Sequence, residues 1–351
     1  MKKTVLALAA LAAVSTSALA QSSVSLYGVL DASLENLKGD DSVTRVSSDN
    51  LAISRFGVRG LEDLGGGLKA KFNLEAGVKV DTGASDSSAF WGRSAWVGIE
   101  GGFGELRLGR QESSIGLLAG NTSILGAQPY DDLKIAGTFS GETYRRVNNG
   151  ITYILPTFVN GLSIQAQYST RTSGEEIAND DTGQAYGFNV QYFAGPFGAG
   201  LGYINAKQNA SGSNKAQGWL AFAAYDFGLA KLTGYYESDD SDAASVAATY
   251  DKREVIGVRV GVPFGSNFNL SAGVSKVSNV GFTQNNDATI VAVKGVYSLS
   301  KRTALYGLIT NVSNDNGSRL AVAGSPASPS AAPVTSDRTS RGIAFGVRHQ
   351  F

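Results

Sequence analysis

The stretch LAISRFGVRGLEDLGGGLKAKFNLEAGV, residues 51–78, alternates between apolar and charged side chains on both sides of a glycine-rich turn. Alternate positions on one face are apolar or small: Phe56, Val58, Gly60, Leu68, Ala70, Phe72, Leu74, Ala76 and Val78. The other face carries the charged residues Arg55, Arg59, Lys69, Lys71 and Glu75. Because successive side chains of a strand point to opposite faces, this stretch predicts a β-hairpin with one apolar and one charged face.

The same alternation recurs along the chain. Short turns separate some of the alternating segments and longer polar loops, beginning with residues 36–50, separate the others. The predicted strands are 23–35, two within 51–78, 90–100, 105–110, 146–155, 162–169, 184–193, 198–206, 217–227, 231–237, 253–262, 268–277, 288–298, 303–312 and 341–351. Sixteen strands of about ten residues, with short turns at one end and long loops at the other, are typical of a transmembrane β-barrel.

The composition narrows the alternatives. The chain has 351 residues with no Cys, so no disulfide stabilises it, and 30 basic residues balance 30 acidic ones, which gives no bulk attraction to nucleic acid. After the first twenty residues no apolar run is long enough for a membrane-spanning helix. A membrane location therefore requires a closed barrel, because an open sheet edge would leave backbone groups unpaired in lipid. The alternative is a secreted soluble β protein.

Residues 1–20 have the features of a secretory signal peptide. Lys2 and Lys3 form a basic start, residues 5–14 are apolar, and Ala18-Leu19-Ala20 matches the A-x-A cleavage pattern. We therefore expect residues 21–351 to be the exported part, folded as a single barrel domain.

The end of the chain and the aromatic residues fit the same architecture. Residues 341–351 alternate up to the terminal Phe351, which resembles the signal by which outer-membrane barrels are recognised for assembly. Aromatic residues near strand ends suit the girdles at the two membrane interfaces: Tyr27, Tyr153, Tyr168, Tyr192, Phe193, Tyr225, Phe227, Tyr297 and Tyr306.

Five motifs together resemble one family. They are SRFGVRGLEDLGGGLKA (54–70), FGELRLGRQ (103–111), RVNNGITYILPTFVNG (146–161), LSKRTALYG (299–307) and GVRHQF (346–351). These motifs resemble the general diffusion porins of β-proteobacteria, of the anion-selective type. The resemblance implies a trimeric, 16-stranded antiparallel barrel with short periplasmic turns and long extracellular loops. Its third loop, here residues 111–145, would fold into the lumen, although the P-E-F-G-G-type motif that many members carry there is absent.

A barrel of sixteen strands encloses a water-filled channel, so its charged face points inward. Arg55, Arg59, Lys69 and Lys71 are expected on the lumen wall, since Arg or Lys facing lipid at mid-bilayer costs about 2–4 kcal/mol. Arg93 is expected inward because it has the opposite parity to Trp96.

The resemblance implies a ladder of three arginines, Arg55, Arg93 and Arg146, with Arg145 as the alternative to Arg146. Opposite the ladder, residues 111–145 supply few acids: Glu112, Asp131, Asp132 and Glu142. We therefore predict a basic constriction that prefers anions, because a guanidinium stays charged and offers several donors to an oxyanion. The alternative is that these arginines pair with Glu75, Glu100 or loop acids and only brace the wall.

The predicted function is an outer-membrane porin for the passive diffusion of small hydrophilic solutes and ions. The expected surroundings are outer-membrane lipid and lipopolysaccharide, with a homotrimer as the assembly. We expect no cofactor, no bound metal and no enzyme activity, because the only histidine, His349, lies in the terminal strand.

The main alternative is a channel specific for a sugar or an organic acid. A sugar channel would need an aromatic ladder in the lumen, whereas most aromatics here have lipid-face parity. A purely structural barrel or adhesin is a further alternative.

Overall fold

A computed structural model describes residues 22–87, 89–122, 128–208, 214–242, 251–325 and 329–351. The expected signal peptide, residues 1–20, lies outside these ranges. No helix in the described ranges combines the length and the apolarity that crossing a membrane requires.

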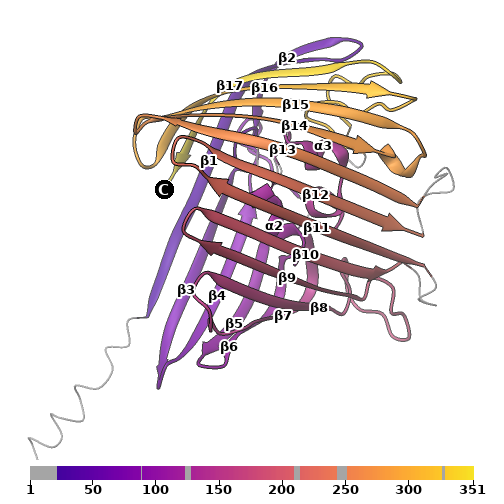
Figure 1. Cartoon of the computed structure of the whole chain (residues 1–351). Coiled ribbons are helices and arrows are strands. Elements are labelled where there is room, and N and C mark those ends of the chain that lie inside the picture. Colours follow the sequence, from indigo (N-terminus) through magenta and orange to yellow (C-terminus); the bar gives the residue numbers. More distant parts are fainter. Residues whose placement is uncertain (1–21, 88, 123–127, 209–213, 243–250, 326–328) are drawn as a thin grey trace, which may run out of the picture.

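The described residues contain seventeen strand segments in one antiparallel sheet, which closes on itself where β1 pairs with β17 (Figure 1). The segments are β1 Ser23–Lys38, β2 Ser42–Ser48, β3 Arg55–Gly65, β4 Leu68–Gly77, β5 Ser94–Gly101, β6 Gly104–Glu112, β7 Arg146–Ile154, β8 Leu162–Ser169, β9 Ala185–Ala194, β10 Phe197–Lys207, β11 Lys215–Asp226, β12 Lys231–Ser241, β13 Lys252–Phe264, β14 Phe268–Ser278, β15 Asp287–Ser298, β16 Thr303–Asp315 and β17 Ser340–Gln350. β2 and β3 share one place, because β2 pairs with the second half of β1 and β3 with its first half. The predicted barrel of sixteen antiparallel strands is confirmed.

The prediction of a loop at residues 36–50 is wrong. β1 continues to Lys38, and β2 returns beside it in a register that runs from Lys38 opposite Ser42 to Ala32 opposite Ser48. The sequence SVTRVSS of β2 carries polar side chains at both parities. An alternation of apolar and polar side chains is therefore absent from β2, although its main chain still pairs with β1.

The barrel has two different ends. At the short-turn end, two residues, 66–67, connect β3 to β4, and the chain terminus follows β17. At the long-loop end, residues 113–145 connect β6 to β7 and residues 316–339 connect β16 to β17. We call residues 113–144 the inner loop, because Arg145 directly precedes β7 and belongs with the wall, and we call residues 316–339 the last loop.

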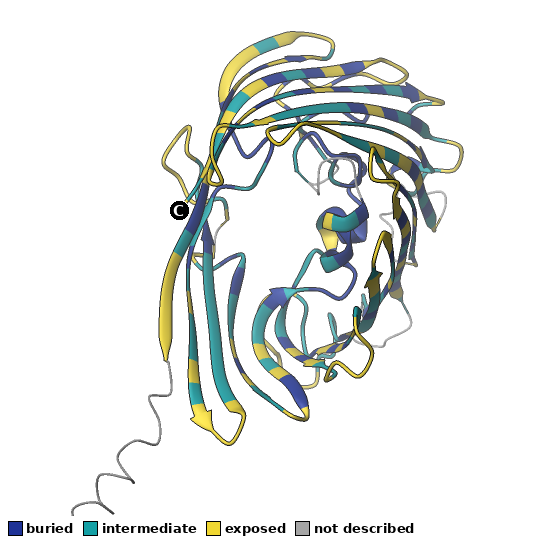
Figure 2. Ribbon diagram, turned by 60° about the vertical axis from the view of Figure 1, so that its left-hand side comes forward, coloured by how far each residue is buried: buried dark blue, intermediate teal, exposed yellow. Residues whose placement is uncertain are grey.

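The two faces of the wall differ in chemistry. On β1, Leu30 and Leu34 are exposed on the outside, whereas Asp31 and Glu35 are buried on the inside. Figure 2 shows this alternation of exposed and buried positions along many strands. The apolar face therefore points outward, toward the lipid, and the polar face lines the lumen.

Three aromatic residues predicted for the interfacial girdles point into the lumen instead: Tyr27, Phe193 and Tyr306. The Tyr27 hydroxyl donates to Glu75 Oε2 at 3.0 Å, and the Tyr306 hydroxyl donates to Asp31 Oδ1 at 2.7 Å. The Phe193 ring lies 6.1 Å from that of Phe222 on the inner face of β11. A place near a strand end does not decide which face an aromatic ring occupies, and in these strands the parity puts the ring inside.

The inner loop lies within the barrel and packs against one side of its wall (Figures 1 and 2). It contains α2 Gly116–Thr122, α3 Asp132–Ala136 and the short π-helix η1 Phe139–Thr143. Its side chains Ile115, Leu118 and Phe139 join Leu220 and Phe222 of β11 in one buried cluster. Burial of this apolar surface stabilises the loop against the wall.

Glycines of β10 let the inner loop come close to the wall. A Cβ at Gly202 would lie 2.2 Å from Leu118 Cδ1, closer than packed atoms approach, and 3.3 Å from Ile115 Cα, which is a tight contact. A Cβ at Gly200 would lie 2.6 Å from Leu118 Cδ2. The absence of side chains at these two positions therefore permits the docked position of α2.

Gly202→Val is expected to overpack this contact and to destabilise the docked inner loop by about 1–3 kcal/mol. We expect a lower unfolding temperature, measured by circular dichroism, and noisier single-channel currents. Gly234→Val is the matched control, because it adds the same side chain to a strand where a new Cβ meets nothing within 4 Å. Equal effects of the two substitutions would contradict the role given to Gly202.

Candidate pore constriction

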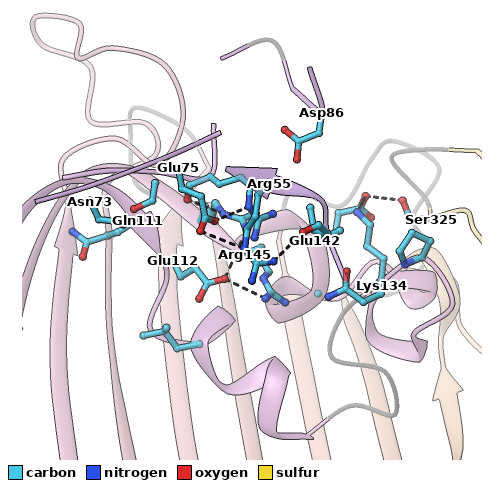
Figure 3. Close-up of a pocket in the computed structure, with 18 of the residues that line it drawn as sticks. Arg55, Asn73, Glu75, Asp86, Gln111, Glu112, Lys134, Glu142, Arg145 and Ser325 are labelled. Atoms are coloured by element: carbon cyan, nitrogen blue, oxygen red, sulfur yellow. Dashed lines mark hydrogen bonds and ion pairs between the residues drawn. The ribbon is translucent and has the colours of Figure 1, made fainter. Parts of the chain in front are cut away.

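A cavity of about 840 Å³ lies between the inner loop and the wall from β3 to β7 (Figure 3). Wall residues reach it from strand ends, or from the position just before a strand, at the long-loop end: Arg55, Glu75, Arg93, Glu112, Arg145 and Arg146. On the other side lie Lys134 and Glu142 of the inner loop and Ser325 of the last loop.

Two of the wall arginines share one carboxylate. Glu75 Oε1 accepts from Arg93 Nε at 2.7 Å, and Glu75 Oε2 lies 3.4 Å from Arg55 Nε. Arg55 Nη1 also donates to the Ile53 carbonyl at 2.9 Å. These contacts fix both guanidinium groups on the edge of the cavity.

The other two wall arginines share a second carboxylate. Glu112 Oε1 lies 3.2 Å from Arg145 Nη2 and 3.7 Å from Arg146 Nη2. Arg146 Nε donates to the Arg93 carbonyl at 3.0 Å, so the pair of arginines around Glu112 is linked to the pair around Glu75. The sequence left Arg145 and Arg146 as alternatives, and the structure places both side chains on the cavity.

Pairing of the arginines with acids, the alternative posed by the sequence, therefore occurs, with Glu75 and Glu112 as the acids. Each of these two carboxylates serves two guanidinium groups. The four arginines consequently keep an excess of positive charge after pairing.

The inner-loop side of the cavity is closer to neutral. Lys134 Nζ pairs with Glu142 Oε1 at 2.8 Å, and the Ser325 hydroxyl donates to the same oxygen at 2.6 Å. The last loop also contacts the inner loop through Ala323 N, which donates to the Pro129 carbonyl at 3.0 Å. Two loops distant in sequence thus form this side of the constriction.

Asp131 and Asp132, expected on the loop side of the pore, are not among the residues that line the cavity. Asp131 caps α3, with its Oδ1 accepting from Leu133 N at 3.1 Å. Asp132 accepts a hydrogen bond from the Tyr235 hydroxyl of β12. Both carboxylates are fully buried because they anchor the loop instead of facing the channel.

Three further basic residues expected at the constriction lie on the lumen wall outside the cavity: Arg59, Lys69 and Lys71. Lys71 Nζ pairs with both Glu100 and Glu105 at 2.8 Å, and Lys69 Nζ pairs with Glu100 at 3.1 Å. The Arg59 guanidinium lies over the Tyr27 ring, 5.1 Å from its centroid. These groups brace the wall nearer the short-turn end.

Arg107 and Trp96 line the cavity without having been singled out by the sequence. The Arg107 guanidinium lies 4.4 Å from the centroid of the Trp96 ring. An inward Arg93 with the opposite parity implied that Trp96 faces lipid, and this inference was wrong. Arg93 lies before β5, and the alternation of faces holds only within a strand. Alternation of Glu105 and Arg107 with two leucines on β6 could have identified Arg107.

The charged residues of the cavity lining have a basic excess. Seven are basic and four are acidic: Arg55, Lys79, Arg93, Arg107, Lys134, Arg145 and Arg146 against Glu75, Asp86, Glu112 and Glu142. Asp49 and Glu105 lie behind the lining and pair with Lys79 and Arg107, which reduces the excess from three to one. The excess belongs to the wall, because the inner loop contributes one paired lysine and one paired glutamate.

The chemistry of this lining suits binding and passage instead of catalysis. The His349 ring lies away from the cavity, with Nδ1 2.9 Å from Thr303 Oγ1 near the short-turn end. Asp240, Asp242 and Asp251 bring carboxylate oxygens within 4.8 Å of one another at the long-loop end, but exposed acidic groups of this kind are common without a metal.

Comparisons with known proteins agree with this geometry. The family model described as Gram-negative porin matches residues 7–317. The chain is 32% identical over 371 residues to the outer membrane porin protein 32 of Delftia acidovorans, with 100% of both chains covered. It is 31% identical over 205 residues to the major outer membrane protein P.IB of Neisseria gonorrhoeae, covering 55% of this chain and 56% of that one. Among solved structures, the anion-selective porin from Comamonas acidovorans has a TM-score of 0.80 and 28% identity, covering 94% of this chain and 100% of that one.

Buried polar contacts hold η1 against β12 and β13. Ser140 N and Oγ both donate to Glu237, at 2.9 and 2.5 Å. Arg253 Nη2 pairs with Asp239 Oδ2 at 2.5 Å, and Arg253 Nη1 donates to the Ala136 carbonyl at 3.0 Å. Arg253 thus compensates a buried acidic pair and fixes the loop.

Arg253→Leu is expected to destabilise the docked loop by about 3–5 kcal/mol, because it leaves buried carboxylates uncompensated. Lys252→Leu is the control, since the neighbouring pair of Lys252 with Glu254 is partly exposed and is worth about 0–1 kcal/mol. The unfolding temperature of each variant is the measurement. A shift for Lys252→Leu as large as that for Arg253→Leu would show that η1 does not depend on the buried pair.

Proposed function

We propose that this chain, which belongs to the family of Gram-negative porins, prefers anions among the solutes that cross its channel. As an outer-membrane porin it is a passive channel and not an enzyme, and its barrel holds the pore open for small hydrophilic solutes and ions. The preference is assigned to the constriction between the inner loop and the arginine wall.

One observation carries the proposal: the wall that the inner loop leaves uncovered is the wall with four arginines and only two glutamates between them. Each guanidinium stays charged at any relevant pH and offers five donors, of which the shared carboxylates use a few. A passing anion meets a series of shallow sites, favourable to enter and weak enough to leave. A passing cation meets repulsion on the same wall.

The name of one relative supports the same preference. The Comamonas acidovorans protein, similar over nearly the whole chain, is described as an anion-selective porin. We extend that property to this chain because its own constriction has a basic wall and lacks the P-E-F-G-G-type motif in the loop.

Orientation, surroundings and assembly are also proposed. The short-turn end faces the periplasm and the long-loop end faces the exterior, as the family resemblance implies. The outward apolar face contacts outer-membrane lipid, and lipopolysaccharide surrounds the long-loop end. Residues 1–20 are removed on export, Phe351 serves as the assembly signal, and three copies associate.

Two aromatics of the lumen, Trp96 and Tyr27, favour this function over a sugar-specific channel. A sugar channel needs exposed aromatic faces along the pore. Here Arg107 covers Trp96 and Arg59 covers Tyr27, with guanidinium-to-centroid distances of 4.4 and 5.1 Å. Cationic groups occupy these ring faces, so they are not available for stacking with a sugar.

The triple substitution of Arg55, Arg93 and Arg146 by Gln is expected to lower the anion-to-cation permeability ratio at least tenfold. At about 8 Å in water each charge lowers the free energy of an anion by about 0.5 kcal/mol and raises that of a cation by the same amount, so three charges contribute about 1.5 kcal/mol from the anion alone. The measurement is the reversal potential in a planar bilayer under a chloride salt gradient. Arg59→Gln is the matched control, because it makes the same change on β3 outside the cavity. Cation preference of the natural chain would contradict the proposal, as would unchanged selectivity of the triple variant.

Glu75→Gln is expected to act in the opposite direction. Removing the carboxylate between Arg55 and Arg93 adds one net positive charge to the cavity, so the anion-to-cation permeability ratio should rise at least twofold by the same estimate. The reversal potential is again the measurement, with Glu62→Gln as a control on the same hairpin, where the carboxylate is exposed and outside the cavity. A fall in the ratio would show that Glu75 acts by holding the arginines in place.

A further inference from the structure

A second basic recess opens on the lumen wall, separate from the constriction. Its volume is about 330 Å³, and it is lined by residues of β12 to β15, by Asp226 at the end of β11 and by the turn that follows it. These strands lie side by side in Figure 1. Its charged residues are Lys231, Arg259 and Lys294, against one acid, Asp226. None of the four lines the constriction cavity.

The recess lies near the short-turn end and about half the ring away from the arginine wall. Lys231 is the first residue of β12, and Asn269 is the second residue of β14, both directly after short turns. Counting β2 and β3 as one, the sixteen places run in chain order, so β12–β15 stand opposite β3–β7. A solute that leaves the constriction toward the short turns therefore passes this recess on the other wall.

The strand parities place the recess inside the barrel. Lys231 shares its face of β12 with Thr233 and with Tyr235, which bonds to the inner loop. Lys294 shares its face of β15 with Ile290 and Ala292, both buried in the barrel interior. The lining also includes the hydroxyls of Thr233 and Ser271 and the amide of Asn269, which are additional hydrogen-bond donors.

The lysines of the recess differ from the constriction arginines in their pairing. Neither Lys231 nor Lys294 makes a side-chain hydrogen bond or ion pair with any residue that the structure describes. Arg259 is held in position, because its Nη2 donates to the Asn121 carbonyl at the end of α2 at 2.9 Å. A positioned guanidinium between two ammonium groups, with neutral donors around them, is a donor set for an oxyanion with more than one charge.

We propose that this recess is a second anion site, which binds a small doubly charged oxyanion, a phosphate or a dicarboxylate. Its volume is at the lower end of ligand pockets, so it accommodates an ion of a few heavy atoms. The inference rests on the proposed channel function but not on the anion preference of the constriction. It gives the channel two anion sites on opposite walls at different depths, approached from different ends.

The test uses single channels of the full-length protein inserted in one orientation, with chloride as the current carrier at low ionic strength. Inorganic phosphate or succinate is added on the short-turn side, and the concentration that halves the chloride current is measured. We expect block by at least one of the two ions. We expect the double variant Lys231→Gln with Lys294→Gln to raise the half-blocking concentration about tenfold, since two charges facing the ion are lost. Stronger block by phosphate identifies a phosphate-type ligand, and stronger block by succinate identifies a dicarboxylate.

Three further variants distinguish block at the recess from block elsewhere in the channel. Lys301→Gln removes an exposed charge from the turn between β15 and β16 at the same end, and block should remain as in the natural chain. Lys294→Arg keeps the charge and should restore block if the glutamine variants fold poorly. The triple arginine variant of the constriction should lose selectivity and keep the block.

Two results would overturn the second site. One is the absence of block from the short-turn side of the natural chain by both ions. The other is block that the triple arginine variant loses and the double lysine variant keeps, which would place the ion at the constriction. Failure of the proposed anion preference is recognised separately, because it appears in the reversal potential of the natural chain without any added phosphate or succinate.

Discussion

A sheet that crosses a bilayer has to pair its own main-chain groups, because lipid offers no partners. In this protein the constraint is met where β1 and β17 pair, from Val29 opposite Gln350 to Lys38 opposite Arg341. The last residue takes part as well: Gly28 and Phe351 exchange two main-chain hydrogen bonds of 3.1 Å. Closure defines an inside and an outside, and from there strand parity decides the chemistry of each face.

Closure of sixteen strands also creates a lumen too wide for wall side chains to fill. The inner loop occupies part of this space, and it does so on one side only. Its apolar side chains pack where Gly200 and Gly202 of β10 leave room, and the main-chain N–H groups of Phe139 and Ser140 donate to the buried acids Asp239 and Glu237. The arginines of β3–β7 remain uncovered because the loop is held on the opposite side. The charge of the pore thus depends on the packing of a loop that carries little of that charge itself.

The sequence predicted what depends on local periodicity and missed what depends on distant contacts. Parity within a strand placed Arg55, Arg59 and Lys71 on the inner wall, because period two holds through a regular strand. It failed for Trp96, since the reference residue Arg93 lies before the strand begins. The place of Tyr306 near a strand end was also misleading, because its hydroxyl lies inside the barrel and bonds to Asp31, 275 residues away in the chain.

The acidic residues of the inner loop also show that contacts between distant residues cannot be predicted from the sequence. Asp131 and Asp132 look equivalent to Glu142 in sequence, as acids in a loop expected beside the pore. Only the docked conformation decides that the two aspartates face α3 and β12 while Glu142 faces the cavity. Strand parity therefore predicted the inward position of Arg55, and the family resemblance supplied Arg93, Arg146 and its alternative Arg145, but the near neutrality of the loop side was not predictable.

The pairing of the wall arginines does not oppose their role in the channel. A carboxylate shared by two guanidinium groups cancels one charge and leaves one, and it holds both groups in a fixed position. Glu75 and Glu112 use only some of the donors that their arginines offer, which leaves other guanidinium donors for an anion in the cavity, although Arg145 Nη1 is buried without a partner among the residues that the structure describes. Unpaired arginines would carry more charge but would lose side-chain entropy on binding each ion. Bracing the wall and binding a passing anion are therefore compatible, because the acids are fewer than the arginines that they position.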